Sequence, residues 1–178
     1  SVSQVASRYA KSLLDLAVDQ KKTEAVRDDM AVFKEALKSR DLVLLLKSPI
    51  IYPGKKIAAL KAIFEGKLDA LTMSFFDLTI KKAGILVVDI ADQFAEQYNN
   101  LFNIALVKVT SAAPLDDATR TIILDKIKGM VGSNKQIQLE TAVNPDLIGG
   151  FIIQYADRLY DSSVAYQLNK LKQTFTHN

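Results

Sequence analysis

The spacing of apolar residues changes near residue 104, and this change constrains the fold of the 178-residue chain more than any other feature. Before it, apolar residues recur every three or four positions, as they do in amphipathic helices. After it, apolar and polar residues alternate in several short segments, as they do in half-buried strands. The two periods predict an α+β chain of two domains, with a helical bundle over residues 1–105 and a small α+β domain over residues 106–178.

The first domain is predicted to be a six-helix bundle. Its helices are expected to begin near Ser3, Thr23, Asp41, Pro53, Asp69 and Val87. The fifth runs from Ala70 to about Ala83, because the Asp69 carboxylate suits an N-cap and Gly84 suits a C′ position. No segment of this half alternates over the length of a strand.

The second domain is predicted to mix strands and helices. Alternating or β-branched residues indicate strands near 104–110, 137–143 and 151–155, the last followed by a turn into Leu159 and Tyr160. Asp116 and Asp117 are expected to begin a helix. Ser162 and Ser163 are expected to open a final amphipathic helix.

The composition removes most catalytic classes. The chain has no Cys, and its single His is His177, next to the C-terminus. A chain end is a poor place for a catalytic base, and no thiolate can act as nucleophile or metal ligand. The carboxylate pairs Asp28–Asp29 and Asp116–Asp117 are interpreted as helix caps or solvated groups. We therefore expect no catalytic residue, no metal site and no cofactor.

Charge and hydropathy give little indication of nucleic acid or membrane partners. The net charge of +3 comes from interspersed residues without a concentrated basic stripe. No apolar run approaches the about 20 residues that span a bilayer, and the N-terminus lacks a signal-peptide pattern. We expect no nucleic acid partner and no direct membrane insertion.

Two glycine motifs stand out. Gly129 and Gly132 match the Gly-x-x-Gly form of an RNA-clamping loop, which supplies the alternative hypothesis of an RNA-binding module. The residues between them are apolar, so a helix end followed by a turn is the preferred interpretation. Gly149–Gly150 is interpreted as a structural turn at a strand entrance rather than as a ligand site.

The predicted fifth helix is apolar on two nearly opposite faces. Leu71, Phe75, Leu78 and Lys82 form one stripe, and Met73, Phe76, Ile80 and Ala83 form the other. A surface helix needs one apolar stripe, so this helix is either buried on all sides or lines a groove for a partner helix. The pattern favours the groove but does not say which stripe faces outward.

Several segments together resemble one family. Residues 144–154, Asn-Pro-Asp-Leu-Ile-Gly-Gly-Phe-Ile-Ile-Gln, look like a motif of the delta subunit of F-type ATP synthases, called the oligomycin-sensitivity-conferring protein in mitochondria. Residues 8–13, 45–49, 82–86 and 160–164 also fit that family, in the expected order along the whole chain. One departure is Ala156, where the family often has Gly, which reaches positive φ more freely.

The resemblance implies a non-catalytic stator subunit. Its N-terminal domain would hold the N-terminal helix of an α subunit of the catalytic head between its first and fifth helices. Carried over by position, the walls of this groove would be Tyr9, Ala10, Leu13 and Leu14 on one side and Phe75, Phe76, Thr79 and Lys82 on the other.

The resemblance also implies a second contact and a place in the cell. The C-terminal domain would engage the b subunits of the peripheral stalk, through Val164, Leu168 and Leu171 and the strand region near Gly149. One copy per complex would then tie the head to the stalk, so that rotor torque is coupled to ATP synthesis and proton transport. The expected location is peripheral, on the cytoplasmic face of a bacterial inner membrane.

Overall fold

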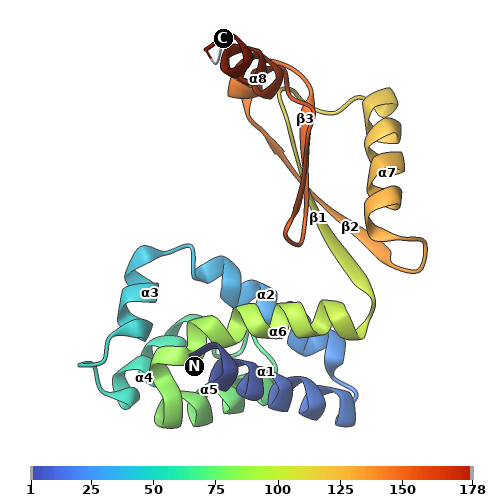
Figure 1. Cartoon of the computed structure of the whole chain (residues 1–178). Helices are drawn as coiled ribbons and strands as arrows, with labels where there is room; N and C mark the ends of the chain where they lie inside the picture. The colour runs from blue at the N-terminus through green and yellow to red at the C-terminus, as the bar shows by residue number, and fades with distance from the viewer. Residues whose placement is uncertain (1, 177–178) are drawn as a thin grey trace. The chain divides into compact units, whose positions relative to one another are not determined.

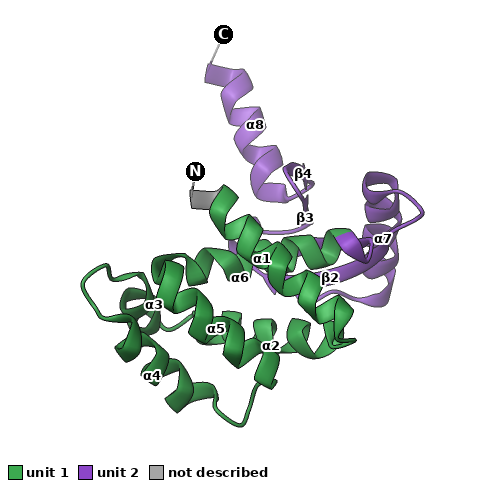
Figure 2. Ribbon diagram, turned by 90° about the horizontal axis from the view of Figure 1, so that it is seen from below, with its two compact units in different colours: residues 1–100 green, residues 101–178 purple. Residues whose placement is uncertain are grey.

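The computed structural model of the chain describes residues 2–176, so His177 lies outside the described residues. The chain divides into two compact units, residues 1–100 and 101–178 (Figure 2). The division lies at 100/101 rather than at the predicted 105/106. The reason is that strand β1 (Ile104–Ser111) pairs with strand β2 (Gln136–Val143) along its whole length, which places residues 104 and 105 in the sheet.

The first unit consists of helices, as predicted for this half (Figure 1). They are α1 (Val2–Asp19), α2 (Thr23–Ala36), α3 (Arg40–Lys47), α4 (Pro53–Phe64), α5 (Ala70–Ala83) and α6 (Val87–Leu101), with the short 3-10 helix η1 (Gly84–Leu86) between the last two. Phe33, Phe76 and Phe94 are among its largest fully buried side chains. The rings of Phe33 and Phe76 lie 4.6 Å apart between centroids, which joins α2 to α5.

Two helix boundaries in this unit differ from the prediction. Ser39, not Asp41, caps α3, because its side chain accepts a hydrogen bond from the backbone N–H of Leu42. Gly84 has a φ of −56° and continues into η1, so it is not a left-handed C′ residue. The chain thus passes from α5 to α6 through a tighter helical turn and not through a glycine stop.

The start of α5 is held by a polar network. Asp69 is the predicted N-cap, and its carboxylate accepts from Leu71 N at 2.9 Å and from Lys22 Nζ at 3.2 Å. Because these bonds favour the charged form, they lower the pKa of Asp69. Asp29 of α2 is buried, and its Oδ2 accepts from Asp69 N at 2.9 Å and from Thr72 Oγ1 at 2.7 Å. Asp29 therefore ties α2 to the first turn of α5.

The second unit is a four-stranded sheet with one helix on one face (Figure 1). The strand order is β2-β1-β3-β4, in which β3 is Phe151–Tyr155 and β4 is Arg158–Asp161. Helix α7 (Asp117–Val131) connects the parallel pair β1 and β2, and Asp116 caps it as predicted. The core between α7 and the sheet contains Ala105, Val107, Val109, Ile123, Ile127 and Ile153. Helix α8 (Val164–Thr176) follows β4.

The turns of this unit explain two sequence observations. Gly129 lies within α7 and Gly132 is its C-cap, with a φ of +92°. This Gly-x-x-Gly segment is a helix end and not an open loop, so it gives no support to the RNA-binding alternative. Ala156, in the turn between β3 and β4, has a φ of +53°, in the left-handed region that disfavours an L side chain.

Candidate functional site

Most residues predicted for the head-binding groove lie in the interior of the first unit. The buried ones are Ala10, Leu13 and Leu14 of α1 and Phe75, Phe76 and Thr79 of α5. Tyr9 is half-buried and Lys82 is exposed. Helices α1 and α5 do contact each other. The chain therefore uses most of the predicted wall residues as core, and the exposed side chains of the two helices flank them.

The outward flank of α1 is apolar. Val5, Tyr9 and Leu16 lie within about 40° of one another around the helix, at about 100° per residue. Val5 and Leu16 are exposed. The opposite flank of α1 faces α6, because Gln97 Nε2 donates to the backbone oxygen of Ser7 at 2.9 Å and to its Oγ at 3.0 Å.

The outward flank of α5 is the part of one predicted stripe formed by Leu71, Leu78 and Lys82, whereas Phe75 of the same stripe is buried. The other stripe is occupied, because Phe76 packs on Phe33 and lines a narrow hollow with Met73 and residues of α4. Leu78 is 53% exposed, although it is an aliphatic residue in the middle of a helix. In the described residues, the exposed side of α5 is therefore that of Leu78 and Lys82.

These two flanks are called here the α1/α5 face, defined as Val5, Tyr9 and Leu16 with Leu71, Leu78 and Lys82. The two helices contact each other, and the exposed flank of each is mainly apolar, with Lys82 at the end of α5. An amphipathic partner helix recognised by its apolar side would suit such a face. Thr79, just inside it on α5, has a buried Oγ1 without a hydrogen-bond partner in the structure.

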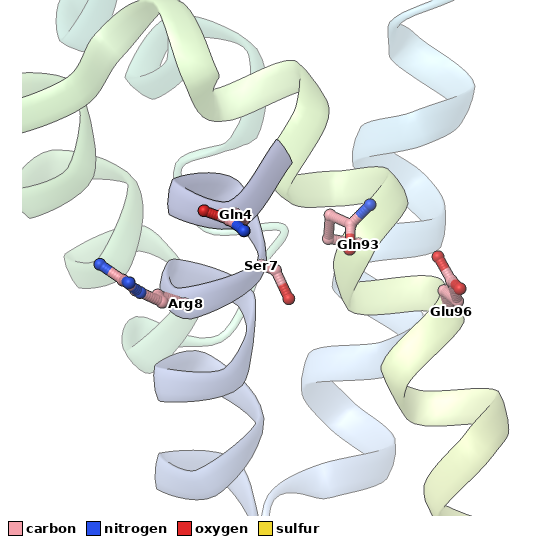
Figure 3. A pocket seen from close by; sticks show the side chains of 5 residues that line it. All are labelled: Gln4, Ser7, Arg8, Gln93 and Glu96. Atoms are coloured by element: carbon pink, nitrogen blue, oxygen red, sulfur yellow. The ribbon is translucent and has the colours of Figure 1, made fainter. Parts of the chain in front are cut away.

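A polar hollow of about 520 Å³ lies on the other side of α1, where it meets α6 (Figure 3). It is lined by Gln4, Ser7, Arg8, Gln93 and Glu96. Arg8 and Glu96 are both exposed. The hollow lacks the buried acid and base that proton transfer requires, and its polar lining does not suit an apolar helix.

In the second unit the predicted stalk-binding residues are all exposed. Val164, Leu168 and Leu171 follow one side of α8 together with Phe175, and these four residues are called here the α8 stripe. An open hollow of about 430 Å³ adjoins this stripe, lined by Ile148, Ala165, Leu168, Asn169 and Lys172. Helix α8 has no buried residue, so its apolar side is available to a partner.

The described residues supply no metal centre and no membrane span. Within residues 2–176, no three His, Asp or Glu side chains come close enough to hold a metal ion. None of the described helices combines the length and the apolar character needed to cross a bilayer.

Sequence reasoning missed part of the site. The predicted contacts do not include Val5, Leu16 or Leu78, although their angular positions beside the buried stripes could have indicated an exposed flank. Sequence reasoning also missed Ile148, which is 66% exposed with a φ of +69°. No sequence pattern predicts a β-branched residue in that conformation.

Comparisons with known proteins identify the family. Residues 5–175 match the family described as ATP synthase delta (OSCP) subunit. Proteins named ATP synthase subunit delta are similar over almost the whole chain: that of Christiangramia forsetii is 35% identical over 99% of this chain and 95% of its own, and that of Amoebophilus asiaticus is 37% identical over 97% and 95%. A third, from Cytophaga hutchinsonii, is 36% identical over 98% and 95%.

The fold has a counterpart among solved structures. A chain in the cryo-EM structure of the Toxoplasma gondii mitochondrial ATP synthase hexamer superposes with a TM-score of 0.65, at 20% identity, over 96% of this chain and 97% of that one. The family match defines the chain as a subunit that associates with other subunits of a complex. The chain belongs to the ATP synthase delta (OSCP) subunit family. It is a structural subunit and not an enzyme.

Proposed function

We propose that the chain links the catalytic head of an ATP synthase to the peripheral stalk. In this proposal the first unit binds the N-terminal helix of an α subunit, and the second unit binds the C-terminal ends of the b subunits. The tether keeps the head from turning with the rotor, so that torque is coupled to ATP synthesis and proton transport. Membership of the delta (OSCP) family supports this role.

The observation that carries the head-side contact is the α1/α5 face. Leu78 and Leu16 are about half exposed on helices that touch, and this arrangement leaves apolar area that a partner helix can remove from water. Burial of apolar area stabilises a contact by about 25 cal/mol per Å², before the entropic costs of association are subtracted. Lys82 at the edge would favour a partner with a carboxylate nearby.

The stalk-side contact rests on the α8 stripe. A helix of 13 residues with no buried side chain gains little from its own domain, so its apolar residues are free to pack on a second helix. Lys170 and Lys172 on the same helix carry no acidic neighbour within α8, which favours an acidic partner segment.

The same proposal gives a location and a copy number. One chain per complex suffices to join one head to one stalk. The named relatives are bacterial, which supports a peripheral position at the cytoplasmic face of a bacterial inner membrane.

The test is a bridging assay with the full chain. A soluble fragment of the b subunits is immobilised, the chain is added, and then a peptide from the N-terminus of the α subunit of the same organism. The proposal predicts that the chain binds both at once, so that peptide is retained only when the chain is present. If the peptide displaces the chain from the b fragment, or if neither is bound, the linking role is wrong.

A further inference from the structure

Helix α8 packs only lightly against its unit. None of its residues from Val164 to Thr176 is buried, and its packing is with the short helix η2 (Pro145–Leu147). Tertiary packing normally fixes where a helix points. With so little packing, the direction of α8 depends on how the chain is held where the helix begins.

Gly149 and Gly150 lie directly against this starting point. Gly150 has a φ of +77°, and a Cβ there would lie 2.4 Å from the backbone oxygen of Ser162 and 3.0 Å from the Cα of Ser163. Both contacts are with backbone, which cannot rotate away as a long side chain can. Only glycine permits this approach. At Gly149 a Cβ would lie 3.1 Å from Cγ2 of Val164.

Backbone hydrogen bonds hold the two segments at this distance. Val164 N donates to the oxygen of Gly149 at 3.0 Å, and Ser162 N donates to the oxygen of Phe151 at 3.0 Å. Gly150 in turn accepts from Ala112 N at 3.3 Å, just after strand β1. The first residue of α8 is thereby joined to the sheet.

Side chains complete the attachment. Asp161 Oδ1 accepts from Ser163 N at 2.9 Å, and Ser163 Oγ accepts from Tyr166 N at 3.1 Å, as an N-cap does. Ser163 is buried although it stands at the base of an exposed helix. The bonds leave little freedom for the turn between β4 and α8.

We propose that this clasp, defined as Gly149, Gly150 and residues 161–163, fixes the direction in which α8 leaves the sheet. Its glycines act as positioning residues, because they do not belong to the α8 stripe but determine where that stripe lies. A partner then meets an oriented surface and does not have to order it, which lowers the entropic cost of binding. The identity of that partner rests on the proposed function, whereas the orienting role does not.

The test measures the direction of α8 in the free chain. Because the protein has no cysteine, spin labels can be attached at Gln138→Cys on β2 and Gln173→Cys on α8, both exposed and both in the second unit. Double electron–electron resonance should give one narrow distance distribution. Gly150→Ala should shift or broaden it by several ångströms, since α8 is roughly 20 Å long and magnifies a displacement at its base.

Gly132→Ala is the matched control. Gly132 also has a positive φ, +92°, but a Cβ there meets nothing closer than 3.7 Å. Gly132→Ala should lower the free energy of unfolding but leave the spin-label distance distribution unchanged. A broad distribution in the otherwise unaltered chain, or one that Gly150→Ala leaves unchanged in folded protein, would overturn the proposal.

A second variant covers the case in which Gly150→Ala does not fold. Gly149→Ala clashes only with the side chain of Val164, so it should shift the distance less, and adding Val164→Ala should restore it. If Gly149→Ala changed the distance only by destabilising the fold in general, removal of atoms from Val164 would not restore the distance. No shift with Gly149→Ala would also contradict the clasp.

Binding to the b fragment is measured separately with the same variants. If Gly150→Ala shifts the distance but the unaltered chain does not bind the b fragment, the clasp stands and the proposed partner is wrong. If the chain binds b and the distance does not change, the proposed function stands and the clasp is wrong.

Discussion

Lys56 Nζ donates a hydrogen bond of 2.7 Å to the backbone oxygen of Leu46, in the last turn of α3. It donates a second bond of 2.7 Å to the oxygen of Ser48, just beyond that helix. Lys56 is buried, and a Cβ on Gly84 would lie 3.7 Å from its Nζ. One ammonium group of α4 therefore satisfies the carbonyl end of α3 beside the turn that leads into α6.

Replacement of this lysine should destabilise the first unit. Lys56→Met keeps most of the apolar stem but leaves two carbonyl oxygens without their donor, at a cost of about 1–3 kcal/mol. Urea unfolding of the full chain followed by circular dichroism measures this. Lys55→Met, at an exposed neighbouring position, should change the free energy of unfolding by much less. Equal effects of the two substitutions would contradict the assigned role.

The same lysine should make stability depend on pH. Burial lowers the pKa of Lys56 in the folded chain from its usual 10.5, because it penalises the charged form. Between the lowered folded pKa and 10.5 the unfolded chain binds more protons, so the contribution of Lys56 to stability rises with pH in this window. The free-energy difference between the unaltered chain and Lys56→Met should therefore grow as the pH rises through the window between the lowered folded pKa and 10.5. A difference that shrinks over that range would be inconsistent with the burial.

Replacement of Asp29 should lower the free energy of unfolding more than replacement of its neighbour Asp28. Asp29→Ala removes the acceptor for Asp69 N and Thr72 Oγ1, which leaves two donors unpaired at the start of α5. We expect a loss of about 1–3 kcal/mol. Asp28→Ala removes an exposed carboxylate and should cost less than half of that. Thermal unfolding of both variants compares them, and a larger effect at Asp28 would refute this account of α5.

Ala156 offers a stabilising substitution. Its φ of +53° destabilises an L residue by about 1–2 kcal/mol. Glycine does not have this strain, but it loses more backbone entropy on folding, so only part of the strain energy is regained. Ala156→Gly should therefore stabilise the second unit by about 0.5–1 kcal/mol. Ala113→Gly, at an exposed position in a bend, serves as the comparison and should not stabilise. A lower melting temperature for Ala156→Gly would mean that the turn does not carry this strain.

The sequence predicted the order and type of the elements well, for a physical reason. In α1 and α5 the apolar period and the Asp69 cap depend only on residues that are close in the sequence. Such patterns predict the type of an element without knowledge of the tertiary structure. Burial is not local: Leu13, Phe75 and Phe76, which the family resemblance places in the groove walls, lie in the core of the chain. An apolar side chain looks the same in a sequence whether it faces its own domain or a partner.

The clasp at α8 was beyond sequence reasoning for the same reason. Gly149–Gly150 predicted a structural turn at a strand entrance, but the backbone that comes close to it is that of Ser162, in another turn. The α8 stripe was predicted correctly as an amphipathic helix face, since its spacing is a local property. The α8 stripe stays exposed because no other part of residues 101–176 packs over it. A local sequence pattern does not predict this.

The central claim is that the α1/α5 face binds a helix, and one comparison tests it most directly. Leu78 on α5 and Leu44 on α3 are exposed to similar extents, 53% and 58%, so neither change to Asp should damage the core. The affinity of each full-length variant for the N-terminal peptide of the α subunit is measured by isothermal titration calorimetry. The account predicts that Leu78→Asp weakens binding at least about tenfold, a loss of about 1.4 kcal/mol, and that Leu44→Asp leaves it unchanged. Unchanged binding with Leu78→Asp, or equal losses for both variants, would contradict it.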